Sequence, residues 1–212
     1  MASKLAVWND ALRLCSERKL TSLTENREAK RLLEAAWADG ATEGSVRRCL
    51  ELGQWAFARR TQQVDYSPSI TPSFGYRYAF DQGADMVRVC GVFQDEYCTT
   101  PLLQYVDERR YWYADLQTIY VQFVSNSTSY GADLSLWPEL FAKTVAADLA
   151  HEIVGNLTQD DKTATRVARE WTYWMKEAKA IDAMNRPTQF LPQGSWLRSR
   201  LRGSRYDSRS TT

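Results

Sequence analysis

The segment LWPELFAKTVAADLAHEIVGNL, residues 136–157, decides the fold that the sequence predicts. Its large apolar side chains recur every four residues, a spacing that places them on one face of a helix: Trp137, Phe141, Val145, Leu149 and Ile153. Pro138 stands near the first turn, where a helix tolerates proline. We therefore expect a long amphipathic helix here, packed against helices from both ends of the chain.

Helical spacing continues on both sides of this segment. Residues 3–16 carry an apolar row at intervals of three and four: Leu5, Trp8, Leu12 and Cys15. Ser22 and Glu25 are spaced as a capping box, which predicts the start of a second helix, and a third runs through residues 46–50. The last helix carries what we interpret as an unbroken core-facing stripe: Ala164, Val167, Ala168, Trp171, Trp174, Met175, Ala178 and Ile181.

The middle of the chain has a different pattern. Nine of the eleven tyrosines lie between Tyr66 and Tyr130, and GYRYAFD alternates aromatic with other residues at strand period. Further β-branched and aromatic runs, MVRVCGVF, YWYAD and QTIYVQFVS, favour more strands. We expect a small antiparallel sheet.

The predicted fold class is mainly α, an antiparallel bundle of about five helices with a small inserted antiparallel β domain. The expected domains are the helical bundle at 1–62 and 132–185, the β domain at 63–131, and an extended basic C-terminal arm at 186–212.

Composition and charge limit the classes of function that the chain can have. The chain has 212 residues, 44% hydrophobic and 25% charged, typical of soluble globular proteins. Every apolar run is broken by a charge, so we expect neither a membrane span nor a signal peptide. Residues 183–212 hold six arginines and one acid, a net +5, which leaves −4 for the rest of this +1 chain. A basic arm on an acidic body predicts that the arm meets an acidic surface.

The arm contains RPTQFLPQGSWLRSRLRGSR, residues 186–205. Disordered tails are poor in large apolar residues, whereas this one combines apolar side chains, prolines and arginines. We interpret it as an arm that docks on a neighbouring subunit or another protein. The candidate docking residues are Arg186, Phe190, Leu191, Trp196, Leu197, Arg198, Arg200, Arg202 and Arg205.

Motifs for catalysis are missing from the sequence. The glycines form no phosphate-binding loop, the four cysteines show no CxxC spacing, and His151 is the only histidine. We expect His151 at the protein surface. Carboxylate pairs for sugar hydrolysis could be chosen among Glu25, Glu28, Glu34 and Asp39, but solvated helix faces commonly offer such pairs. We therefore expect no enzyme activity, cofactor or metal.

Several stretches, spread in order over nearly the whole chain, resemble a known family: LAVWNDALRLCSERKLTSLTENREAKRLLEAAW, RRCLELGQWAFARR, YRYAFDQGADMVRV, LWPELFAKTVAADLA and AKAIDAMNRPTQFLPQGSW. They are similar to the head-to-tail adaptors of tailed bacteriophages, in particular the tail tubular protein A group of short-tailed phages.

The resemblance implies a structural protein of the virion neck, present in the host cytoplasm during assembly. Such adaptors form a ring, dodecameric in the family, beneath the portal protein. The ring extends the DNA channel, through which the genome passes without sequence-specific binding. It also provides the platform for a tail nozzle similar to tail tubular protein B. The arm's partner is then the portal or the adjacent protomer.

Two alternatives come from other functional classes. A related adaptor in some phages is credited with cell-wall hydrolysis, so the chain could be a virion-associated peptidoglycan hydrolase. It could also be a DNA-binding protein that uses the basic arm. The acidic body argues against DNA binding, since a DNA-binding protein normally carries positive charge on its folded surface.

Overall fold

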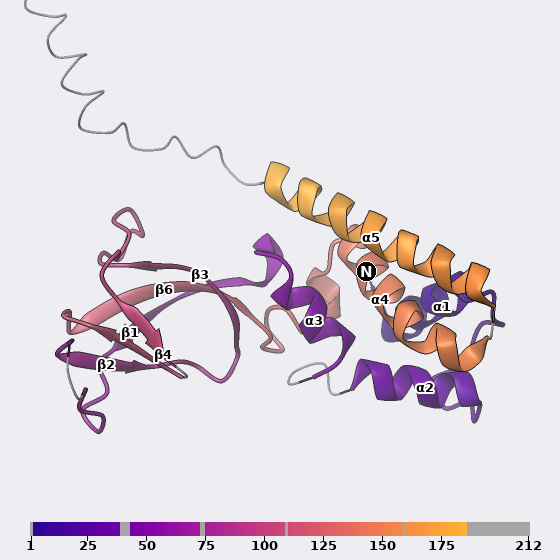
Figure 1. The fold of residues 1–212 in the computed structure, drawn as a ribbon, viewed down its shortest axis with the longest axis horizontal. Coiled ribbons are helices and arrows are strands. Elements are labelled where there is room, and N and C mark those ends of the chain that lie inside the picture. The colour runs from indigo at the N-terminus through magenta and orange to yellow at the C-terminus, as the bar shows by residue number, and fades with distance from the viewer. Residues whose placement is uncertain (1, 39–42, 73–74, 109, 159, 186–212) are drawn as a thin grey trace, which may run out of the picture.

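A computed structural model of the chain describes residues 2–38, 43–72, 75–108, 110–158 and 160–185. The helices gather at one end of the molecule and the strands at the other (Figure 1). In chain order the elements are α1 Lys4–Leu14, α2 Glu28–Trp37, α3 Ser45–Glu51, the 3-10 helix η1 Ala56–Ala58, β1 Arg59–Asp65, β2 Tyr78–Asp81, β3 Met86–Phe93, β4 Val106–Glu108, β5 Tyr111–Ala114, β6 Thr118–Ser125, the 3-10 helix η2 Leu134–Leu136, α4 Glu139–Leu157 and α5 Asp161–Met184.

Helix α4 is the centre of the helical part, where it contacts α1, α2, α3 and α5. The predicted row of apolar residues spaced four apart is confirmed, since all five side chains are buried. At the start of α4, aromatic rings from separate segments meet: the Trp137 ring centroid lies 6.0 Å from that of Trp37 and 5.0 Å from that of Phe141. The segment at 136–157 therefore organises the helical core.

The strands are inserted between α3 and α4 and form two three-stranded antiparallel sheets, ordered β1-β6-β3 and β2-β5-β4. The two sheets enclose a second core: Phe80, Val92, Leu102, Trp112, Ala114, Ile119, Val121 and Phe123. Strand β6 belongs to both cores, because Phe123 packs between the sheets while Val124 packs on the helices.

Polar contacts hold the inserted strands together and join one of them to α3. Arg60 Nη1 and Ser125 Oγ both donate hydrogen bonds to Asp85 Oδ2, at 2.8 and 2.7 Å. The Arg88 guanidinium donates to the Glu51 carbonyl at the end of α3, at 2.8 Å. The first two bonds tie β1 and β6 to the turn before β3, and the third joins β3 to the end of α3.

The predicted fold class is wrong. The molecule is an α+β protein, because the middle of the chain forms two sheets with a core of their own and not one small sheet beside a mainly helical fold. The strands also begin at Arg59, earlier than expected. Strand β1 reads RRTQQVD and is mostly polar, so it lacks the apolar alternation by which strands are recognised.

Two local predictions also need correction. Helix α2 begins at Glu28 without a side-chain cap, and Glu25 instead binds the backbone and hydroxyl of Thr21. The stripe of α5 is only partly in the core: Val167, Met175 and Ala178 are buried, whereas Ile181 is 42% exposed. Helix α5 lies along the outside of α4 (Figure 1), so one side of it is covered.

The buried thiol of Cys15 gives a prediction about pH. Burial, with a smaller contribution from the Glu17 carboxylate, raises the pKa of Cys15 from 9.0 to about 11. We expect iodoacetamide at about pH 8 to leave this thiol unmodified in the native protein and to modify it after unfolding. As pH rises, the thiol ionises in the unfolded chain before it ionises in the native protein. The stability that the neutral, buried thiol contributes is therefore complete below about pH 9.0 and is lost as the pH rises toward about 11. Rapid native labelling of Cys15, read by mass spectrometry, would contradict this.

Candidate functional site

His151 has surroundings that suit a surface residue. It is exposed on α4, with its ring centroid 6.1 Å from that of Trp171. Asp148, one turn earlier, is buried and accepts hydrogen bonds from Arg48. The expected surface position of His151 is confirmed, and the Asp148 carboxylate is engaged by an arginine.

Arg48 joins α3 to α4 through a cluster of polar contacts. Its Nη2 donates to Asp148 Oδ2 at 2.9 Å and to Ser45 Oγ at 3.0 Å, and it also pairs with Glu152. Asp148 is 8% exposed, whereas the Arg48 side chain is 46% exposed. Buried carboxylates are retained when a cation and hydrogen bonds compensate them, so this cluster fixes the angle between the two helices.

Replacing Arg48 with methionine should lower the free energy of unfolding by about 1–3 kcal/mol, because the buried Asp148 carboxylate would lose its donor. The exposure of Arg48 favours the lower half of that range. Arg47→Met is the matched control: its guanidinium bonds Glu51 one turn along the same helix at 2.9 Å, and such surface pairs are worth about 0.5 kcal/mol. Urea unfolding of both variants measures the difference, and equal losses would contradict a special role for Arg48.

The carboxylates considered for hydrolysis lie near or on α2. Glu25 accepts a hydrogen bond from the Thr21 backbone at 2.9 Å, and this bond is the main cause of its lowered pKa. A general acid of a glycosidase needs a raised pKa, so Glu25 has the opposite property. Glu34 pairs with Lys30 at 2.7 Å, Glu28 lies in the first turn of α2, and Asp39 lies outside the described residues.

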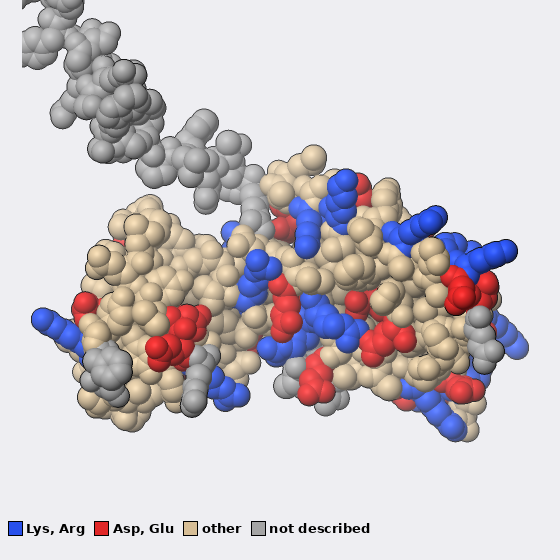
Figure 2. Space-filling view, in the orientation of Figure 1, with Lys and Arg blue, Asp and Glu red and all other residues tan. Residues whose placement is uncertain are grey.

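Charge is unevenly distributed over the face in Figure 2. Basic and acidic side chains intermix over the helical part, while most of the β part on this face is uncharged. A nucleic-acid surface commonly shows a stripe of one sign, and this face of the helical part shows both signs side by side.

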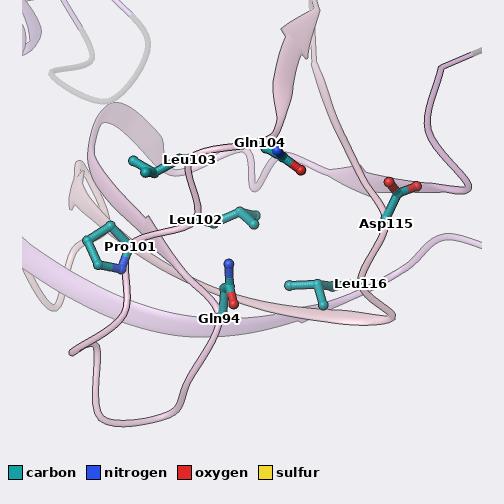
Figure 3. A pocket seen from close by; sticks show the side chains of 7 residues that line it. All are labelled: Gln94, Pro101, Leu102, Leu103, Gln104, Asp115 and Leu116. Atoms are coloured by element: carbon teal, nitrogen blue, oxygen red, sulfur yellow. The ribbon is translucent and has the colours of Figure 1, made fainter. Parts of the chain in front are cut away.

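At the far end of the β part is a pocket of about 340 Å³, which we call the β-tip pocket. It is lined by Gln94, Pro101, Leu102, Leu103, Gln104, Asp115 and Leu116. Gln94, Leu102 and Leu116 point toward one another across it, whereas Leu103 points away (Figure 3). Leu103 is 87% exposed and Tyr97, on the same loop, is 78% exposed. Exposed apolar side chains beside a pocket of mixed polar and apolar lining suit contact with another protein.

A second pocket, of about 210 Å³, lies between the start of α4 and the end of α5; we call it the α4–α5 pocket. Its lining residues are Trp55, Pro138, Glu139, Leu140, Phe141, Ala178, Ile181, Asp182 and Asn185. The Trp55 and Phe141 rings pack edge to face with their centroids 4.9 Å apart, and both side chains are almost fully buried. Ile181, which is 42% exposed, is one of the residues that the sequence misassigned to the core.

The docking residues predicted from the sequence, Arg186 to Arg205, lie outside the described residues, so the structure neither brings them together nor separates them. Sequence reasoning missed both pockets. The adjacent leucines Leu102 and Leu103 could have indicated the β-tip pocket. Neighbouring side chains in an extended segment face opposite ways, so one of two adjacent leucines there is expected to be exposed.

Within the described ranges, no group of three or more His, Cys, Asp or Glu side chains could hold a metal ion. In the same ranges, no helix combines the length and apolar character needed to cross a membrane. No protein-family model matches the chain, and comparison with curated proteins gives no match.

Proposed function

We propose that the chain is a structural head-to-tail adaptor of a tailed bacteriophage. In this role it forms a homo-oligomeric ring, a dodecamer, beneath the portal protein in the virion neck. The ring extends the channel for the genomic DNA and receives a nozzle similar to tail tubular protein B. The protein itself is made in the host cytoplasm and performs no catalytic step.

The observation that carries the proposal is the order of the elements along the chain and their packing. Helices from both ends pack around α4, the strands lie in one inserted body, and α5 leads directly into an apolar and basic arm. The stretches that resemble the adaptor family cover α2, nearly all of α1 and the first part of α4. A connector needs separate contact surfaces for the proteins on its two sides, and the arm and the β-tip pocket are candidates for these.

The charge of the chain supports the same role. Without residues 183–212 the chain carries −4, a sign that repels DNA phosphates. A channel for a sliding duplex has to avoid tight phosphate contacts, because each one would hold the DNA in place. The basic residues of the arm then serve contacts with protein.

Electron microscopy of the protein mixed with its portal tests the proposal. We expect ring-shaped density on one face of the portal, with regular rotational symmetry. The same preparation is added to a peptidoglycan suspension, where we expect no fall in turbidity. A portal left bare, or a suspension cleared in a way that Glu28→Gln or Glu34→Gln abolishes, would overturn the adaptor assignment.

A further inference from the structure

The α4–α5 pocket lies where the described chain ends. Asn185 closes α5 and lines the pocket, and the arm begins at the next residue. The wall opposite is formed by the first turn of α4 and by Trp55. An apolar hollow therefore lies directly beside the last described residue of α5.

Chain length allows the arm to return to this pocket. Phe190 follows Asn185 by five residues, which in extended conformation span at most about 18 Å. Pro187 cannot continue a helix and restricts Arg186 to extended conformations. The sequence therefore does not favour a continued helix beyond Asn185, and Phe190 is the first large apolar residue that follows.

The rim of the pocket carries the charge opposite to that of the arm. Glu139 and Asp182 contribute carboxylates to its lining; Glu139 also pairs with Lys143 at 2.7 Å, and Asp182 Oδ1 accepts from the Ala56 backbone at 2.7 Å. Residues 183–212 have a net charge of +5. The pocket thus combines an aromatic floor for an apolar side chain with acidic residues at its rim, and Arg186 stands four residues before Phe190.

We propose that Phe190, with Leu191 beside it, occupies the α4–α5 pocket of its own chain whenever the protein is free of partners. The four residues between Asn185 and Phe190 keep the ring at an effective concentration in the millimolar range, above that of a second copy in solution. Binding of the arm to a partner then requires Phe190 to leave the pocket. The inference goes beyond the adaptor role and does not rest on it.

Fluorine NMR of the full chain labelled with 4-fluorophenylalanine tests this inference. The chain has seven phenylalanines, and the resonance that disappears in Phe190→Leu identifies Phe190. We expect this resonance in the native protein to be shifted from its position in urea, and to stay there on serial dilution. Ile181→Asp, which places a charge at the pocket mouth, should return the resonance to its position in urea.

Met184→Asp is the matched control, since Met184 is 76% exposed on the same helix and does not line the pocket. It should leave the Phe190 resonance in place. The resonances of the buried Phe80 and Phe123 report whether the β part of each variant is folded, and the dispersed resonance of the buried Phe141 reports the helical core. An unshifted Phe190 resonance in the native protein, a shift that disappears on dilution, or a shift that survives Ile181→Asp in a folded chain would each overturn the inference.

Discussion

Replacing Phe141 with alanine should lower the free energy of unfolding by about 3–5 kcal/mol, the cost of removing a fully buried aromatic side chain. Phe141 is 1% exposed and lies in a cluster of rings. Its ring centroid is 4.9 Å from that of Trp55, 4.8 Å from that of Phe57 and 5.0 Å from that of Trp137. The alanine variant would leave a cavity, because the neighbouring rings belong to separate segments and cannot all move in to fill it. Urea denaturation measures the loss.

Tyr173→Ala is the control for Phe141→Ala, because Tyr173 is an aromatic residue on α5 that is 53% exposed. Its loss should change stability by no more than about 0.5 kcal/mol. Trp171, which the sequence placed in the core, is half-buried, and Trp171→Ala should fall between the two. A Phe141→Ala variant as stable as Tyr173→Ala would show that the ring cluster contributes little.

Removal of residues 186–212 should abolish attachment to the portal and leave the chain folded. The last buried side chain of α5 is Ala178, so both cores remain complete. Within the arm, Trp196→Ala should weaken attachment most, because a buried tryptophan anchor contributes about 2–4 kcal/mol per subunit. Arg200→Ala should mainly reduce the association rate and its salt dependence, since rim charges are screened over about 8 Å.

Cosedimentation with portal rings at low and high salt separates these effects. Trp196→Ala should fail to pellet with the portal at both salt concentrations, whereas Arg200→Ala should pellet normally at low salt. Phe190→Ala is a useful comparison, because it removes a different apolar residue of the same arm. Truncated protein that pellets as well as the full chain would show that the arm takes no part in docking.

The helical core was predictable from sequence because its signal is local. Trp137, Phe141 and Val145 are spaced by one helical turn, and the spacing alone identifies the buried face. Helix α1 followed from the same rule. The predicted surface position of His151 needed only its place opposite the apolar row of α4.

The sheets and the edge of the helical core were less predictable because they depend on distant segments. Strand β1 pairs with β6, so that Arg60 lies opposite Phe123. The residues of RRTQQVD do not by themselves indicate which strand they pair with. The burial of Ile181 depended on how far α4 covers α5, which the α5 sequence does not contain. The α4–α5 pocket is formed by three separate segments, so no single stretch of sequence could indicate it.

The insertion of the strands between α3 and α4 sets the order in which the protein can fold during synthesis. The Cys15 thiol donates to the Ala150 carbonyl, 135 residues later. Helices α1, α2 and α3 therefore leave the ribosome well before α4, with side chains such as Trp8 and Leu12 still lacking their cover. The β part can complete its own core in that interval, and contacts between segments so far apart in sequence form slowly. The N-terminal helices thus gain their packing partner α4 only after strands β1 to β6 have been synthesised.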